Sequence, residues 1–331
     1  MDPIEWITSN LEVKRVETDE MYYSGESQSG YQLPLIYIPF DPNDPGHWAD
    51  RGQALDYSMV AGPGRVLDFG PGDGWPSLIV APFVEEVVGV DGSKKRVEVC
   101  AENARRMGLK NASFVHVPAG KSLPFEDASF DGVMASASIE ETPDPRATLQ
   151  NIYRILRPGG RLRFRYNAYI EHSGRPEREL ELRETDDRYT HLSVWDRHLD
   201  EQHVRHIRLG IRLTNDEVSE VFRRHGEHLS YAGLTPEVLS DLRPHLLDAL
   251  TCTRIRPTGE TFLRWLRQIG FSSAQETYEG GWFARHLFSQ IPESERPTEI
   301  VDIDLMLRPV VKVVITMRKP VELNGTITAM K

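Results

Sequence analysis

The stretch that decides the fold is 66-VLDFGPGDG-74, in which Gly70, Gly72 and Gly74 alternate with other residues. A short apolar run precedes the first glycine, and the segment 75-WPSLIVAPF-83 follows the last one. A glycine-rich loop between a strand and a helix allows the backbone to approach a bound nucleotide closely. We therefore predict that this loop holds a ligand of the nucleotide class.

The spacing of the glycines excludes two common loops of this kind. A dinucleotide-binding loop reads G-x-G-x-x-G, and counted from Gly70 its third glycine would fall at position 75, which is Trp75. A phosphate-binding P-loop ends in lysine followed by serine or threonine, and no such pair follows here. The ligand expected at this loop is therefore neither a dinucleotide nor a P-loop nucleotide.

Strands and helices alternate on both sides of the loop. Short apolar runs predict five strands, at 64–70, 85–92, 111–117, 129–138 and 161–169. Helical spacing with capping residues predicts three helices, at 93–108, 144–160 and 258–270. Two further strands are predicted around 282-WFARHLF-288 and 310-VVKVVITM-317. This rhythm with short links is typical of an α/β, doubly wound, mostly parallel sheet.

The chain divides into a core and additions to it. Residues 1–50 are aromatic-rich and predict an N-terminal arm that covers the site; the core takes 51–169 and 258–320, and 321–331 form a C-terminal tail. The polar segment 170–257 predicts an inserted α+β subdomain that leaves from the carboxyl end of a core strand. Ligands of open α/β sheets bind at that edge. We expect the insertion to form a lid over the acceptor site or, through 205-RHIRLGIRL-213, a homodimer contact.

Composition bounds the partners of the protein. The 331 residues carry a net charge of −11, which makes nucleic acid an unlikely partner. No apolar run is long enough for a membrane span, and the first ten residues do not resemble a signal peptide. The chain has two cysteines, Cys100 and Cys252, so a disulfide framework is not expected. These features favour a cytoplasmic protein.

An ordered set of motifs resembles a known family. The motif 66-VLDFGPGDG-74 is followed by 87-VVGVDGS-93, 123-LPFEDASFDGVMAS-136 and 143-PDPRATLQNIYRILRPGGRL-162. Together they resemble class I S-adenosylmethionine-dependent methyltransferases, in particular the small-molecule branch that is similar to ubiquinone and menaquinone biosynthesis enzymes. The resemblance covers roughly 60–168 and 258–318. It implies a seven-stranded Rossmann-like sheet, S-adenosyl-L-methionine as the cofactor and a small organic acceptor.

The resemblance also implies which residues hold the methyl donor. The three glycines would lie along the methionine tail, Asp68 would help to hold its ammonium group, and the backbone near Ser136 would lie beside it. Asp91 would accept both ribose hydroxyls, although a helix-capping role is the alternative. Family members often carry an adenine-binding aspartate where this chain has Ala119, so the backbone of Ala119 and Gly120 is expected to hold the adenine.

The acceptor is expected beside the last two strand ends. Methyl transfer needs a base only if the acceptor must lose a proton. Glu140 and Glu141 are candidates for deprotonating a hydroxyl or pairing with an ammonium group, and His172 is a second candidate base. The alternative for the two glutamates is a place in the first turn of a helix, where the helix dipole favours acidic residues.

Several other features keep alternatives open. The six histidines from His191 to His228 in the insertion lack metal-binding spacing, so no metal site is predicted. Arg161, Arg163 and Arg165 alternate along one strand, and we expect them near a sheet edge or opposite acidic residues of the insertion.

An aminopropyltransferase and a non-catalytic S-adenosyl-ligand-binding protein remain alternative functions. The second is motivated by Ala119.

Overall fold

A computed structural model describes residues 1–18, 21, 40–185 and 189–331. The chain forms two compact units. The core unit comprises Leu33–Tyr169 and Pro257–Lys331, and the insertion unit comprises Met1–Gln32 and Ile170–Arg256. The tyrosine pair Tyr22–Tyr23, which the sequence places in the N-terminal arm, lies outside the described residues.

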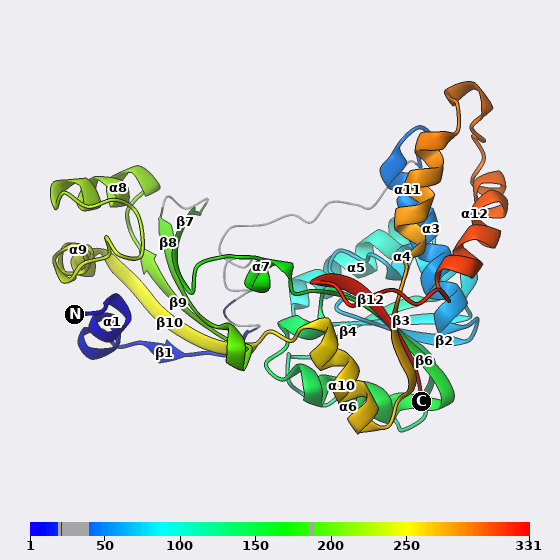
Figure 1. The fold of residues 1–331 in the computed structure, drawn as a ribbon, viewed down its shortest axis with the longest axis horizontal. Coiled ribbons are helices and arrows are strands. Elements are labelled where there is room, and N and C mark those ends of the chain that lie inside the picture. Colours follow the sequence, from blue (N-terminus) through cyan, green and yellow to red (C-terminus); the bar gives the residue numbers. More distant parts are fainter. Residues whose placement is uncertain (19–20, 22–39, 186–188) are drawn as a thin grey trace. The chain divides into compact units, whose positions relative to one another are not determined.

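The core unit is built on a seven-stranded sheet in the order β11-β12-β6-β5-β2-β3-β4 (Figure 1). The five strands from β6 to β4 are parallel, and β12 is antiparallel to both of its neighbours. The α/β, mostly parallel, Rossmann-like sheet predicted from the sequence is therefore confirmed. The strands are β2 Arg65–Phe69, β3 Glu86–Asp91, β4 Ala112–His116, β5 Phe130–Ser136, β6 Leu156–Asn167, β11 Ser272–Thr277 and β12 Asn324–Met330.

Helices cover both faces of this sheet. On one face, α6 and α10 bury apolar side chains such as Ile152 and Phe262 against Phe164 of β6. On the other face, α3 packs against β5 and β6 and buries Tyr57 completely. The helices of the core unit are α3 Pro45–Ala61, α4 Ser77–Val80, α5 Lys94–Arg106, α6 Pro145–Ile155, α10 Gly259–Ile269, α11 Gly280–Gln290 and α12 Ile300–Val314, with 3-10 turns η1 Ala81–Phe83, η2 Ile139–Glu141 and η5 Glu293–Glu295.

The predicted capping residues fix the helix ends. Ser93 accepts a hydrogen bond from the backbone N–H of Arg96 at the start of α5, and Asp144 accepts one from that of Ala147 at the start of α6. Gly270 ends α10 in the left-handed conformation that favours glycine. These local signals are short-range, so the sequence predicts them well.

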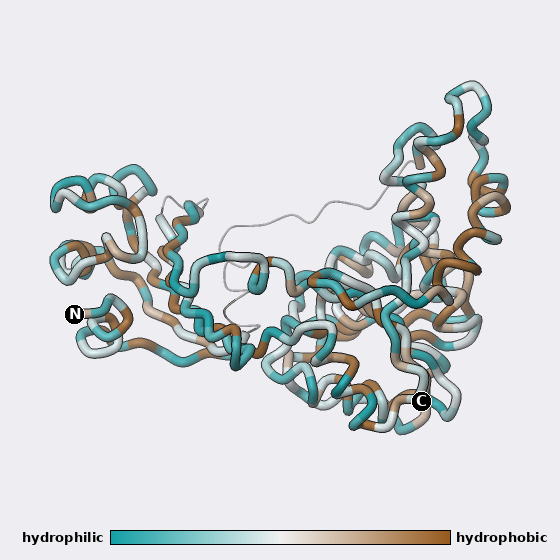
Figure 2. Tube along the Cα trace, in the orientation of Figure 1, coloured by the Kyte–Doolittle hydropathy of each residue, from teal (hydrophilic) through white to brown (hydrophobic). Residues whose placement is uncertain are grey.

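Two predicted strands are helices. The segment 282–288 lies in α11, 310–314 form the end of α12 and 315–317 follow it, and the sheet is completed instead by β11 and β12. The sequence of α12 is largely hydrophobic (Figure 2) and rich in β-branched residues, which favours a strand locally. Burial at spacings of three and four residues, at Ile303, Leu307, Val311 and Val314, stabilises a helix there. The predicted tail 321–331 therefore contains a core strand.

Residues 41–48, within the predicted N-terminal arm, contain the start of α3. Asp44 accepts a hydrogen bond from the backbone N–H of Gly46, and Pro45 occupies the first turn, where a missing N–H costs nothing. Residues 45–50, which the sequence analysis assigned to the arm, thus belong to a core helix.

Arg163 has a different partner from those expected. The side chain points from β6 to α3 and is fully buried in a bidentate ion pair with Asp56, with both N–O distances 2.7 Å. The expected partners in the insertion have other contacts, since Glu179 binds Arg197 and Glu181 accepts from the Trp195 ring.

The insertion unit is a five-stranded sheet in the order β1-β10-β9-β8-β7. Its strands are β1 Lys14–Arg15, β7 Arg178–Glu184, β8 Thr190–His198, β9 His203–Ile211 and β10 Leu246–Ile255; its helices are α1 Pro3–Asn10, α8 Asn215–Arg224 and α9 Pro236–Leu242, with 3-10 turns η3 Leu199–Glu201 and η4 Arg243–His245. The three helices pack on one face of the sheet (Figure 1). Helix α7, Tyr169–His172, lies where the chain passes from one unit to the other.

The first 18 residues belong to this insertion unit. β1 pairs in parallel with β10, and Ile4, Trp6 and Ile7 of α1 join its hydrophobic core. The sequence predicts this segment as part of a separate arm, since nothing near it in the chain points to a partner strand more than 200 residues away.

The strand proposed for a homodimer contact is not an edge strand. β9 is hydrogen-bonded to β8 on one side and to β10 on the other. Its backbone groups are therefore used within the unit, and a second copy could not pair with this strand edge to edge.

Within the described ranges, no helix combines the length and the apolar character that crossing a bilayer requires.

Candidate functional site

The glycine loop, the end of β3 and the end of β5 meet at one edge of the core sheet. The N–H of Gly70 donates to the carbonyl oxygen of Val90 at 2.8 Å, and the Ser138 hydroxyl donates to the carbonyl oxygen of Phe69 at 2.5 Å. Parallel neighbours β3, β2 and β5 end at the same edge, which is why segments up to 69 residues apart in sequence come together.

All three loop glycines have backbone conformations that only glycine adopts without strain. Their φ angles are +74° at Gly70, +63° at Gly72 and +115° at Gly74. A Cβ at Gly70 would lie 2.4 Å from the Cβ of Ser138, and one at Gly74 would lie 2.4 Å from Cδ1 of Leu78. The chain's own packing therefore requires glycine at these two positions, in addition to any approach of a ligand.

Helix α5 anchors the far side of the loop. The Cys100 thiol donates to the carbonyl oxygen of Gly72 at 3.2 Å, and the Asn103 amide donates to that of Asp73 at 2.8 Å. Cys100 is fully buried, and burial raises its pKa. It is a packing residue and not a nucleophile, in agreement with its helical spacing in the sequence.

Asp68 lies completely buried beneath the loop. Its Oδ2 accepts hydrogen bonds from the backbone N–H of Ser77 at 2.9 Å and from the Ser77 hydroxyl at 2.5 Å. Its Oδ1 is buried and has no hydrogen-bond donor among the described residues. A buried carboxylate oxygen without a donor is costly, so this atom fits a role in holding a cationic group of a ligand.

Burial raises the pKa of Asp68 from 3.8 to about 7, against the lowering effect of its bonds from Ser77. The folded protein therefore keeps a proton that the unfolded chain releases, and stability falls as the pH rises through this window. We expect the melting temperature of the wild type to fall more between about pH 5 and about pH 8 than that of Asp68→Asn. Asp127→Asn, at an exposed aspartate, is the control; equal pH slopes for wild type and Asp68→Asn would contradict the prediction.

Asp91 connects the end of β3 to the glycine loop. Its Oδ2 accepts from the backbone N–H of Gly72 at 3.2 Å, and its Oδ1 accepts from that of Ser93 at 2.9 Å. The cap of α5 is Ser93, so the alternative that Asp91 itself caps this helix is wrong. An ionised carboxylate has about four acceptor positions. Its acceptance of ligand hydroxyls stays a prediction.

The remaining predicted donor residues lie at the ends of β4 and β5. Ala119 and Gly120 follow β4, and Gly120 has a φ of +77°. A Cβ at Gly120 would lie 3.4 Å from Cγ of Pro143. Ser136 ends β5 and is half-buried. These positions flank the same sheet edge as Asp91, and their contacts with a donor stay predictions.

Glu140 and Glu141 form the 3-10 turn η2, outside helix α6. Both occupy the first turn of this short 3-10 helix, which agrees with the alternative that they lie in the first turn of a helix. Glu140 is 2% exposed, and its Oε1 accepts from the backbone N–H of Asn167 at 2.8 Å. It thus ties η2 to the carboxyl end of β6. Glu141 is half-buried at the same turn.

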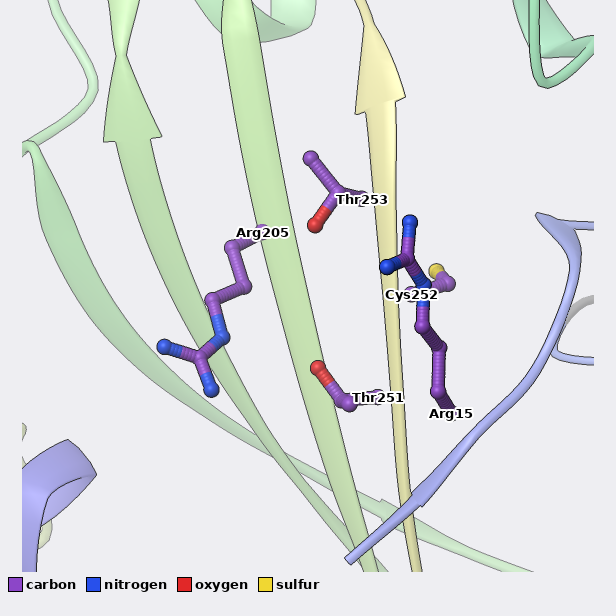
Figure 3. Close-up of a pocket in the computed structure, with 5 residues that line it drawn as sticks. All are labelled: Arg15, Arg205, Thr251, Cys252 and Thr253. Atoms are coloured by element: carbon purple, nitrogen blue, oxygen red, sulfur yellow. The ribbon is translucent and has the colours of Figure 1, made fainter. Parts of the chain in front are cut away.

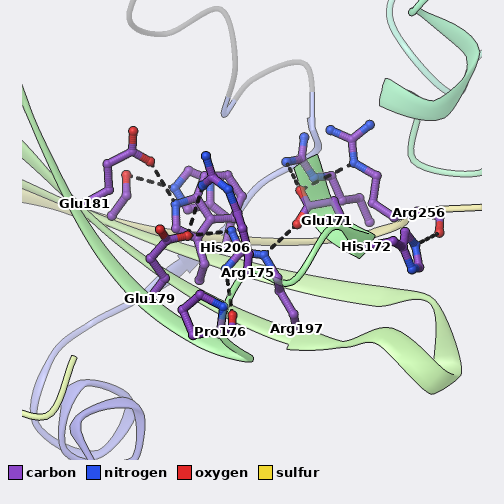
Figure 4. A network of polar contacts seen from close by, with 12 residues as sticks. Glu171, His172, Arg175, Pro176, Glu179, Glu181, Arg197, His206 and Arg256 are labelled. Atoms are coloured by element: carbon purple, nitrogen blue, oxygen red, sulfur yellow. Dashed lines mark hydrogen bonds and ion pairs between the residues drawn. The ribbon is translucent and has the colours of Figure 1, made fainter. Parts of the chain in front are cut away.

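His172 belongs to the insertion unit, where its Nε2 lies 3.1 Å from the carbonyl oxygen of Arg256. It neighbours a polar network around Glu171 (Figure 4). The Glu171 carboxylate binds Nε of Arg197 at 2.7 Å and lies 3.3 Å from Nη2 of Arg254. Although burial raises the pKa of Glu171, these arginines hold it below its usual value. The role of His172 as a base stays a prediction.

The histidines of the insertion take part in polar and aromatic contacts. His206 stacks on Trp195 with ring centroids 3.9 Å apart, and burial lowers its pKa to about 3. Burial also lowers the pKa of His191 to about 4, while His225 lies 2.9 Å from Asp241. Over the ranges that the structure describes, no group of three or more histidine, cysteine, aspartate or glutamate residues could hold a metal ion.

Sequence reasoning missed the contribution of α3 to the site. The Trp75 ring N–H, directly after the glycine loop, donates to Asp50 of α3 at 2.9 Å. The Tyr57 hydroxyl donates to the carbonyl oxygen of Ala135 at the end of β5, at 3.0 Å. The capping pair at the start of α3, Asp44 and Pro45, could have indicated the helix. Nothing in the local pattern indicates these long-range contacts.

Comparison with known proteins places the site in context. Residues 67–164 match the family model described as a methyltransferase domain. The chain is 35% identical over 112 residues to the uncharacterized methyltransferase YcgJ of Bacillus subtilis (strain 168), covering 34% of this chain and 44% of that protein. It is 39% identical over 103 residues to the demethylmenaquinone methyltransferase of Clavibacter sepedonicus, covering 31% and 40%. The chain thus spans less than half the length of these relatives.

Among solved structures, one similar chain is an S-adenosylmethionine-dependent methyltransferase from Clostridium acetobutylicum ATCC 824. It is 11% identical, with a TM-score of 0.48 over 94% of this chain and 97% of that one.

Proposed function

Because residues 67–164 are a methyltransferase domain of the class I S-adenosylmethionine-dependent family, we propose that this protein transfers a methyl group from S-adenosylmethionine to a small organic acceptor. The observation that carries the proposal is the loop of three left-handed glycines joined to Asp91 by the 3.2 Å bond from Gly72. This arrangement places two buried carboxylates, Asp68 and Asp91, beneath and beside one glycine-rich stretch of backbone.

The residues present fit the donor. The buried Oδ1 of Asp68 would accept from its ammonium group, and the carboxylate of Asp91 would accept from its ribose hydroxyls. Ala119 and Gly120 offer backbone groups to the adenine. When bound, the donor supplies a sulfonium methyl group that is already activated for displacement. The protein must therefore mainly position the acceptor and exclude water.

The strand ends of β5 and β6 are assigned to the acceptor. Glu140 already fixes this corner through its bond from Asn167, so we assign it a positioning role. Glu141, on the same turn and less buried, is the candidate for receiving an acceptor proton or pairing with an acceptor ammonium group.

A small organic acceptor is favoured by the relative named for demethylmenaquinone. The two alternative functions have less support. The matched relatives are named as methyltransferases, and aminopropyl transfer rests only on the acidic pair Glu140 and Glu141.

The proposal predicts which ligand binds. We expect S-adenosylmethionine and S-adenosylhomocysteine to give saturable heats by isothermal titration calorimetry, and NAD to give none, because Trp75 stands where a dinucleotide loop needs glycine. Binding of NAD without binding of an S-adenosyl ligand would overturn the proposal. Tight donor binding with no transfer of labelled methyl to any acceptor in a broad panel would favour the non-catalytic alternative.

Removing the Asp91 carboxylate should weaken donor binding. We expect Asp91→Ala to reduce the affinity for S-adenosylhomocysteine by about 1.5–3 kcal/mol, roughly 10- to 150-fold, the usual contribution of hydrogen bonds to a charged group. The matched control is Ser93→Ala, which removes the α5 cap that neighbours Asp91. It should lower stability by about 1 kcal/mol and leave affinity unchanged. An affinity for Asp91→Ala within twofold of the wild type would remove Asp91 from the donor site.

A further inference from the structure

A hollow of about 310 Å³ lies in the insertion unit (Figure 3). None of its lining residues belongs to the core unit, which carries the donor site. It is lined by Arg15 of β1, Arg205 of β9 and Thr251, Cys252 and Thr253 of β10. Its volume is at the lower end of the range for small-molecule sites. Two arginines and two hydroxyls on three neighbouring strands make it a polar, positively charged site.

Strand register places the four polar side chains on one face of the sheet. Arg15 is paired with Thr251, and Thr253 is paired with Arg205. Thr251 is also paired with Ile207, whose side chain joins the core beneath the helices. Paired residues project to the same face. The hollow is therefore the polar continuation of the helix-bearing face, and the hydrogen-bonded sheet holds its lining residues in place.

The two guanidinium groups are not neutralised within the described part of the chain. Neither Arg15 nor Arg205 has an ion pair with any described residue. The carboxylate paired in register with Arg205 is Asp196, and it is engaged elsewhere. Its Oδ1 lies 3.2 Å from Nε of Arg178, and its Oδ2 lies 3.2 Å from Nε2 of His198.

The two threonines offer different groups. The Thr251 hydroxyl donates to the carbonyl oxygen of His206 at 3.2 Å, so it can only accept from a ligand. The Thr253 side chain is exposed and has no hydrogen bond with a described residue, which leaves its hydroxyl free to donate. Together with the two guanidinium groups, the Thr253 hydroxyl gives the hollow donors that suit a negatively charged group.

We propose that this hollow binds a small ligand through an anionic group, a phosphate or a carboxylate. Arginine matches the geometry of both groups, since its planar fork donates two parallel hydrogen bonds. A site with two arginines and no carboxylate among its described lining residues favours a doubly charged group. The proposal concerns the insertion unit alone and is independent of methyl transfer.

The test uses the full-length protein with two probes, inorganic phosphate and succinate, titrated calorimetrically at constant ionic strength. We expect one or both probes to bind saturably. Arg205→Gln and Arg15→Gln should each weaken that binding by roughly tenfold, and Thr253→Val by a smaller factor. The matched control is Arg212→Gln, which removes the same charge from an exposed position just after β9.

The outcomes separate the possible sources of the anion. Binding of phosphate alone indicates a phosphate-bearing ligand, binding of succinate alone indicates a carboxylate, and binding of both supports the shared chemistry. Absence of saturable binding by either probe would overturn the proposal. An equal loss for Arg212→Gln and Arg205→Gln would also overturn it, because the effect would then be one of overall charge. Circular dichroism and the melting temperature check that each variant is folded.

Discussion

Replacing Asp56 with alanine should lower the free energy of unfolding of the core unit by about 3–5 kcal/mol, the usual cost of leaving a buried charge without its partner. The partner is Arg163, and both side chains are completely buried. Arginine does not lose its proton in a protein, so the variant must keep an uncompensated guanidinium group in the core or unfold. Urea denaturation measures the loss.

The effect should be large because this ion pair joins several elements. Asp56 lies on α3 and also accepts from the backbone N–H of Gly280 at the start of α11, at 2.7 Å. Arg163 lies on β6 and donates to the Thr328 hydroxyl of β12 at 2.7 Å, to the Thr277 hydroxyl of β11 and to the carbonyl oxygen of Tyr278 at 2.9 Å. Loss of the carboxylate thus disturbs the packing of two helices on three strands.

A double variant distinguishes the cost of an unpaired buried charge from the contribution of the ion pair itself. Replacement of a buried ion pair by apolar residues of similar volume is often neutral or stabilising. We therefore expect Asp56→Leu/Arg163→Met to be at least about 2 kcal/mol more stable than Asp56→Ala. The exposed pair Arg105–Glu102 is the matched control, and Glu102→Ala should leave stability close to that of the wild type. A loss for Asp56→Ala as small as that of Glu102→Ala would contradict the prediction.

This ion pair illustrates why the sequence predicts some of the fold and not the rest. The strands and capped helices from β2 to β6 follow from patterns within about ten residues, as at Ser93 and Asp144. The partner of Arg163 lies 107 residues away, and no local pattern points to it. The strand predicted at 310–317 is wrong for a related reason: this valine-rich stretch favours a strand locally, and packing of α12 against α3 and α11 stabilises the helix.

In the candidate site, too, some residues could be predicted from the sequence and others could not. Asp68 and Asp91 lie at the carboxyl ends of β2 and β3, and the glycine loop follows β2. Parallel strands bring their carboxyl ends to one edge, so topology alone brings these residues together. The supporting contacts were not predictable. Ser77 binds Asp68 only because the chain turns back after the loop, and Ser138 reaches Phe69 only because β2 and β5 are neighbours.

A substitution at Gly70 tests whether packing against Ser138, and not only the left-handed backbone conformation, fixes the structure of the loop. Its φ is +74°, and a Cβ there would lie 2.4 Å from the Cβ of Ser138. Ser138 cannot move freely, because its hydroxyl is bonded to the carbonyl oxygen of Phe69 at 2.5 Å. We expect Gly70→Ala to cost about 2–5 kcal/mol of stability, from backbone strain plus overpacking. Donor affinity should fall by about tenfold or more, since a shifted loop changes its bond with Asp91.

Gly108 provides a matched control for the cost of placing alanine in the left-handed backbone conformation. Its φ is +70°, nearly the same as that of Gly70, but a Cβ there would meet nothing within 4 Å. Gly108→Ala should therefore cost only the strain, about 1–2 kcal/mol, and leave donor affinity unchanged. The difference between the two variants measures the contact with Ser138. A second variant, Gly70→Ala/Ser138→Gly, removes the clashing Cβ and should recover part of the stability. If Gly70→Ala and Gly108→Ala lost the same stability and the same affinity, the contact would contribute nothing, and the glycine would be explained by its φ angle alone.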